Sequence, residues 1–136
     1  MRIAATVKHA ALSQAVSVMT DGAPKSIGVP AREDGRGSAI NGGELLMLAL
    51  ATCYCNDLYR EASRRELVLD AVEVEATADF DGVGAAATNV RYRARVASAA
   101  PASRIEALLR ETDAVAEVHK TVRVGTPVEL VPWDEV

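Results

Sequence analysis

The 136-residue sequence has few aromatic side chains, only two cysteines, no excess of positive charge and no long apolar run. Because aromatic residues make up 4% of the chain, a core must be built mainly from Ala, Val, Leu and Ile. No segment has the ~20 consecutive apolar residues that cross a bilayer. The formal net charge of -4 gives no electrostatic reason to expect nucleic acid or an anionic membrane as a partner.

The first residues, MRIAATVKHAAL, do not have the form of a signal peptide, because they are polar and their apolar run is short. We therefore expect a cytoplasmic protein, in which thiols stay reduced. Cysteines there are typically buried small hydrophobes, redox groups or metal ligands. The length fits one domain over residues 1–136 with its own core.

The order of apolar patterns predicts a two-layer α+β domain of strands and two long helices. Strands are predicted at residues 3–7 and 15–19, with a turn at residues 9–14, then around 27–29, at 71–80, at 89–96 and at 126–131. The strands at 71–80 and 89–96 alternate apolar residues with Glu and Arg respectively. If they pair antiparallel, these charges face each other across the sheet, where such ion pairs contribute about 0.2–1 kcal/mol each. The arginines then need no phosphate partner.

A long helix is predicted from Asn41 to about Arg65, and a second from residue 102 to 121 with a break near Asp113. Asn41 and Glu44 have the spacing of a capping box. Every residue from 45 to 51 is apolar, so no side of these turns suits water. We therefore expect a central buried helix covered by an antiparallel sheet and by a second protomer.

Both cysteines, Cys53 and Cys55, lie on the first predicted helix. Residues two apart on a helix are about 200° apart around its axis. The two thiols therefore cannot form a disulfide or share a metal ion without breaking the helix. Taken singly, each is most simply a packing residue, and Cys53 becomes reactive only if a neighbouring group lowers its pKa.

Two segments resemble motifs of the OsmC/Ohr family, the osmotically inducible protein C and organic hydroperoxide resistance proteins. NGGELLMLALATCYCNDL, residues 41–58, resembles the central-helix motif N-P-x-E-L-L-x-A-A-L-A-x-C. AEVHKTVRVGTPVEL, residues 116–130, resembles C-P-V-H-x-T-L followed by a terminal P-V strand. The resemblance implies an OsmC-like fold completed by an intertwined homodimer, in which two central helices lie between sheets built from both chains.

The resemblance also implies a chemistry for Cys53, which matches the thiol that attacks a hydroperoxide and becomes a sulfenic acid. In the family a second cysteine then closes a disulfide, and here Ala116 stands at its position. An Arg and a Glu hold the family's thiolate ionised, and Gly43 stands at the Glu position. Glu44 lies half a turn from Cys53 and is expected to cap the helix. The family Arg has no alignable match among the early cations, which are Lys25, Arg32 and Arg36.

Two functions remain open at this level, and with them the question of whether the chain is an enzyme. The first is reduction of organic hydroperoxides, an oxidative-stress defence, through Cys53 and an external resolving thiol. The second is a non-catalytic dimer of the same fold that binds a small apolar ligand at its interface. His119 matches the family's motif histidine and is a candidate neighbour of Cys53, although the two would give a metal only two ligands. We expect no metal and no cofactor.

Overall fold

The computed structural model describes residues 1–10 and 13–135. Over these residues the chain is a mixed α+β protein with antiparallel sheets and helices α1, α2 and α3. Its contacts divide it into two compact units, Met1–Leu45 and Leu46–Val136. The single domain expected over residues 1–136 stays a prediction. No helix in the described ranges is both long and apolar enough to cross a membrane.

The first unit is a three-stranded antiparallel sheet in the order β1-β2-β3. β1 (Ile3–Ala10) and β2 (Ser13–Thr20) confirm the first two predicted strands and extend both. Part of the turn predicted between them, residues 11–12, lies outside the described residues. β3 (Ala23–Ser26) was expected around residues 27–29 and lies earlier. The reason is a two-residue turn at Asp21 and Gly22, whose positive φ angles of 47° and 83° fit a type I′ hairpin and return the chain at once.

Helix α1 (Gly42–Arg64) confirms the long helix predicted from Asn41. Its first turn is closed by the predicted capping box. The Glu44 backbone N–H donates to Asn41 Oδ1 at 2.9 Å, and the Asn41 N–H donates to Glu44 Oε2 at 2.8 Å. At the other end Glu66 adopts a positive φ of 54°, which turns the chain out of the helix.

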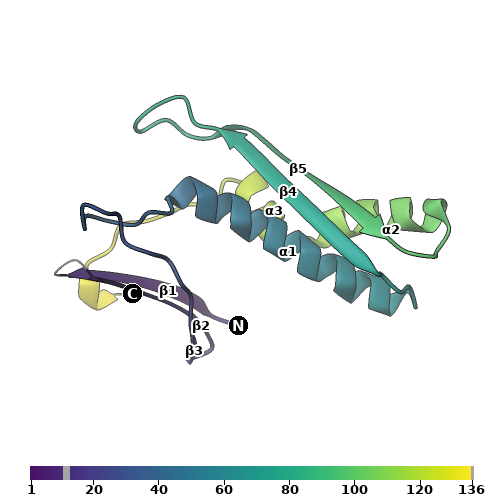
Figure 1. The fold of residues 1–136 in the computed structure, drawn as a ribbon, viewed down its shortest axis with the longest axis horizontal. Coiled ribbons are helices and arrows are strands. Elements are labelled where there is room, and N and C mark those ends of the chain that lie inside the picture. Colours follow the sequence, from purple (N-terminus) through teal and green to yellow (C-terminus); the bar gives the residue numbers. More distant parts are fainter. Residues whose placement is uncertain (11–12, 136) are drawn as a thin grey trace. The chain divides into compact units, whose positions relative to one another are not determined.

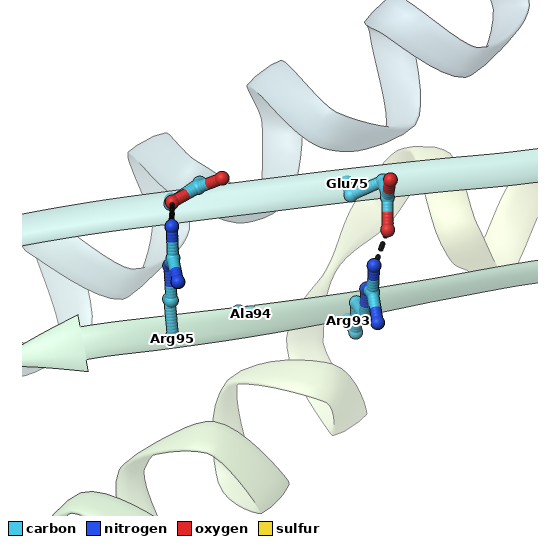
Figure 2. Close-up of a pocket in the computed structure, with 5 residues that line it drawn as sticks. Glu75, Arg93, Ala94 and Arg95 are labelled. Atoms are coloured by element: carbon cyan, nitrogen blue, oxygen red, sulfur yellow. Dashed lines mark hydrogen bonds and ion pairs between the residues drawn. The ribbon is translucent and has the colours of Figure 1, made fainter.

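In the second unit, β4 (Ala71–Asp79) and β5 (Thr88–Ala97) form an antiparallel hairpin that lies along α1 (Figure 1). The predicted alternation is confirmed, because the charged side chains share the outer face. Glu75 pairs with Arg93 and Glu73 with Arg95 across the strands (Figure 2). All four are exposed, so these pairs add little to stability.

The core of the second unit lies between α1, the inner face of the β4–β5 hairpin, and α2. Its buried members are Tyr54, Leu58, Ala62, Leu67, Leu108 and Ala116. The inward valines of the hairpin and Tyr92 pack against them. This packing holds α1 in place from Tyr54 onward and therefore positions the turn that carries Cys53.

The helix predicted over residues 102–121 is two helices, α2 (Ala102–Val115) and α3 (Glu117–Arg123). The break expected near Asp113 falls three residues later, at Ala116, whose φ of -68° and ψ of 109° are extended. Ala116 has 0% exposure. The break gives α3 an N-terminus of its own.

One further sequence prediction is corrected. Residues 126–131 were predicted as a strand, but their backbone is irregular. A strand needs a neighbouring edge for its N–H and C=O groups, and none of the five described strands pairs with this segment. Val128 and Leu130 are accordingly fully exposed. The first turns of α1 were expected to be covered in part by a second protomer. Leu48 is 54% exposed in the single chain, so that covering stays a prediction.

Candidate functional site around Cys53

Cys53 lies half-buried on α1, on the side of the helix that meets the beginning of α3. Its Sγ donates a hydrogen bond to Asp57 Oδ2, one helical turn later, at 3.5 Å. The backbone of Val118, in the first turn of α3, also hydrogen-bonds to Cys53. The thiol therefore has one carboxylate partner and one backbone partner.

The surroundings favour the neutral thiol over the thiolate. Burial is the largest effect and raises the pKa of Cys53. The hydrogen bond from the Val118 backbone acts in the opposite direction, but the charges of Asp57 and Glu117 and the Asp57 hydrogen bond raise the pKa further. Within the described chain Cys53 is therefore held as a thiol at neutral pH.

Arg60 connects the carboxylates around this thiol. Its Nη1 lies 2.7 Å from Asp57 Oδ1, and its Nε lies 3.1 Å from Glu61 Oε1. The same Nη1 lies 3.8 Å from Glu117 Oε1. Asp57 is only 4% exposed, and a buried carboxylate requires such a partner. One guanidinium thus fixes the carboxylate that in turn holds the Cys53 thiol.

Sequence reasoning missed Asp57 and Arg60, although a signal for them was present. Residues four and seven positions after Cys53 lie on its own face of a helix, since seven residues make about two turns. Glu117 carried no comparable signal, because its place beside Cys53 depends on the break at Ala116.

Ligand atoms of Cys53, Asp57 and Glu117 all lie within 4.8 Å of one another. A thiolate and two carboxylates are groups that bind zinc. However, the Arg60 guanidinium already neutralises Asp57 and approaches Glu117, so a metal would have to compete with a fixed cation. We assign no metal to this cluster.

His119, the other residue singled out from the sequence, is packed among aromatic rings. Its ring centroid lies 4.4 Å from that of Tyr92 and 5.8 Å from that of Tyr54. It is 3% exposed, and neither ring nitrogen has a hydrogen-bond partner within the described residues. Burial, followed by the charge of Arg123, lowers its pKa, so the ring is neutral. The polar partners of the Cys53 thiol are Asp57 and Val118 rather than this ring.

The hydroxyl groups beside His119 serve to join elements. Tyr54 donates to the Leu109 carbonyl at 2.6 Å, and Tyr92 donates to Asp113, which also accepts from Arg123 at 2.6 Å. Burial raises the pKa of Tyr54 to about 12. Both hydroxyl groups therefore keep their protons near neutral pH.

The remaining sequence candidates are Cys55, Ala116 and three early cations. Cys55 is also a free cysteine and lines a shallow recess of about 270 Å³ with Leu48, Ala51, Thr52, Asn56 and Val74. Ala116, at the position of the expected second cysteine, contributes only a buried methyl group. Lys25, Arg32 and Arg36 belong to the first unit, where the Arg32 Nε donates to the Ser38 carbonyl at 3.1 Å.

Helix α1 packs on an antiparallel hairpin and carries a half-buried thiol that faces the N-terminus of α3. These features define a thiol-bearing α+β protein. The chain belongs to the OsmC-like protein family, whose model matches residues 35–131. This confirms the resemblance drawn from the two motifs. No protein with curated annotation matches the sequence significantly.

Solved structures of the family share the fold. An OsmC-like protein from Mycoplasma pneumoniae has a TM-score of 0.63 at 13% identity, over 90% of this chain and 86% of that one. The organic hydroperoxide resistance protein OsmC from Legionella pneumophila has a TM-score of 0.61 at 17% identity, over 90% of both chains. An organic hydroperoxide resistance protein from Elizabethkingia anophelis has a TM-score of 0.62 at 16% identity, over 90% and 89%. At these identities the likeness establishes the fold alone.

Proposed function

We propose that the chain reduces organic hydroperoxides through Cys53 and that an external thiol regenerates it. The observation that carries this proposal is the position of Cys53: a half-buried thiol on the central helix, at the site that matches the family's reacting cysteine. Relatives of the same fold are named for hydroperoxide resistance, which is consistent with an oxidative-stress role.

The reaction needs one thiol of the chain and two of a reductant. The Cys53 sulfur attacks the terminal peroxide oxygen, the O–O bond breaks, and the alkoxide leaves as an alcohol after taking a proton. Cys53 is then a sulfenic acid. A first external thiol then forms a mixed disulfide with Cys53 and releases water. A second external thiol attacks this mixed disulfide, which frees the Cys53 thiol and joins the two reductant thiols in a disulfide.

An external thiol is required because no cysteine of the chain can resolve the sulfenic acid. The only other cysteine, Cys55, lies about 200° around the helix from Cys53. Ala116 stands where the family's second cysteine is expected. We place this chemistry in the cytoplasm, where small thiols are kept reduced.

The test is mass spectrometry with a sulfenic-acid trap after mixing the chain with cumene hydroperoxide. We expect the trap on Cys53 in the wild-type chain and in Cys55→Ser, and no trapped product in Cys53→Ser. Labelling of Cys55 at the same rate as Cys53, or no trapped product on Cys53, would contradict the proposal.

We also propose that two copies of the chain form the functional unit. Leu48 of α1 and Val128 and Leu130 of the final segment are exposed in the single chain, and the final segment has the sequence of a strand without a partner edge. A second copy of the chain would cover Leu48 and would supply a strand edge for the final segment. Sedimentation at micromolar concentration should give twice the chain mass of 14.4 kDa. A chain that sediments as a monomer at high micromolar concentration would contradict this.

A second candidate function is a non-catalytic dimer that binds a small apolar ligand. It is favoured by one observation, namely that the surroundings of Cys53 raise its pKa rather than lower it. The trapping experiment separates the two candidates, because an inert Cys53 leaves only the binding function.

A further inference from the structure

The charged groups that act on the Cys53 thiol are both carboxylates. One is Asp57, which accepts its hydrogen bond, and the other is Glu117, at the start of α3. Their oxygens and the sulfur lie within 4.8 Å of one another. Arg60 pairs with these carboxylates, and the thiol hydrogen-bonds to Asp57 rather than to the guanidinium.

The Arg60 guanidinium forms ion pairs with three carboxylates, and its pair with Glu117 is the longest. Arg60 lies 2.7 Å from Asp57 and 3.1 Å from Glu61, but 3.8 Å from Glu117. The Glu117 side chain is 71% exposed, whereas that of Asp57 is 6% exposed. A molecule that approaches the sulfur from solvent therefore meets the Glu117 carboxylate.

We propose that Glu117, with Asp57 behind it, makes Cys53 select its thiol partner by charge: cationic and neutral thiols are accepted, and thiols that carry carboxylates are disfavoured. The inference rests on the proposed function for the step it concerns, the attack of an external thiol on oxidised Cys53. The physical reason is that the Glu117 carboxylate lies within 4.8 Å of the Cys53 sulfur, so a charged group a few bonds beyond that sulfur in a mixed disulfide comes near it. At that separation unlike charges attract and like charges repel even at the high dielectric of a surface.

The electrostatic preference can be measured without peroxide by thiol–disulfide exchange, in which the Cys53 thiolate attacks a small symmetrical disulfide and releases one thiol. The probes are cystamine, bis(2-hydroxyethyl) disulfide and dithiodiglycolate, which are cationic, neutral and anionic. The full-length chain carries Cys55→Ser throughout, so that Cys53 is the only thiol. Because the probes differ in intrinsic reactivity, the quantity compared is the ratio of the variant rate to the parent rate for each probe.

Glu117→Gln should raise this ratio most for the anionic probe and least for the cationic one, with a difference of about three- to tenfold at ~10 mM ionic strength. The difference should shrink at ~1 M salt, where the screening length falls to about 3 Å. Glu106→Gln is the matched control. It removes the same charge from an exposed position on α2, outside the cluster of Cys53, Asp57 and Glu117, so its three ratios should be equal.

Equal ratios for the three probes in Glu117→Gln would overturn the inference, as would a Cys53 that exchanges with none of them. Its failure is distinguishable from failure of the proposed function. If the exchange rates show a charge preference but hydroperoxide gives no sulfenic acid, the proposed peroxidase activity fails and the charge selection at Cys53 stands. If hydroperoxide gives sulfenic acid but the exchange rates show no charge preference, the peroxidase activity stands and the charge selection fails.

Discussion

Replacing Asp57 by asparagine is expected to make Cys53 more reactive. The substitution removes the charge and the carboxylate acceptor that favour the neutral thiol, while the amide keeps the shape of the side chain. The pKa of Cys53 therefore falls and the thiolate fraction at pH 7 rises. In a Cys55→Ser background the rate of alkylation by iodoacetamide at pH 7 should increase roughly three- to tenfold.

The pH dependence of the alkylation rate tests the direction of the Cys53 pKa shift independently. Since the pKa of Cys53 is raised in the parent chain, its alkylation rate should still climb about tenfold per pH unit between roughly pH 7 and 9. Asp57→Asn should shift this limb to lower pH. Glu61→Gln is the control, since Glu61 also contacts Arg60 but the Cys53 thiol donates to Asp57, and its profile should match the parent. A profile for Asp57→Asn that is unchanged or moved to higher pH would show that Asp57 does not hold the thiol.

Replacing Leu58 by alanine is expected to remove much of the stability of the second unit. Leu58 has 0% exposure and packs at the centre of the core, with Tyr54 and Leu108 among its neighbours. Truncating a fully buried leucine leaves a cavity and costs about 2–5 kcal/mol. Domains of this size have free energies of unfolding of only about 5–15 kcal/mol. The loss should appear as a lower denaturant midpoint in urea at fixed protein concentration.

Two further variants show whether that loss arises from packing. Leu58→Met keeps nearly the same volume and should cost less than about 1.5 kcal/mol. Val68→Ala truncates an apolar side chain that is 75% exposed and should change stability by about 0.5 kcal/mol or less. A Leu58→Ala chain as stable as Val68→Ala would contradict the position of Leu58 in the core.

The parts of the fold that the sequence predicts well are those determined by neighbouring residues. The capping box of Asn41 and Glu44 spans four residues, and the alternation in β4 and β5 is visible within each strand. The parts that fail depend on distant partners. β3 was misplaced because the type I′ turn at residues 21–22 brings the chain back sooner than expected. Residues 126–131 form no strand because none of the described strands offers them a pairing edge.

The candidate site divides in the same way. The face shared by Cys53, Asp57 and Arg60 follows from helical spacing and can be found in the sequence. The approach of Glu117 and Val118 to that face cannot, because it requires the break at Ala116 and the packing of α3 beside α1. His119 was expected near Cys53 because it matches the family's motif histidine, but its environment is decided by Tyr54 and Tyr92, which come from other parts of the sequence.

The central claim is that Cys53 alone is oxidised by an organic hydroperoxide and is restored by an external thiol. The most direct measurement is the intact mass of the wild-type chain after one equivalent of cumene hydroperoxide, before and after addition of cysteamine. The account predicts the gain of one oxygen atom, mapped to Cys53, and its disappearance with cysteamine. A chain that keeps its mass, or that loses two hydrogen atoms by joining Cys53 to Cys55, would contradict it.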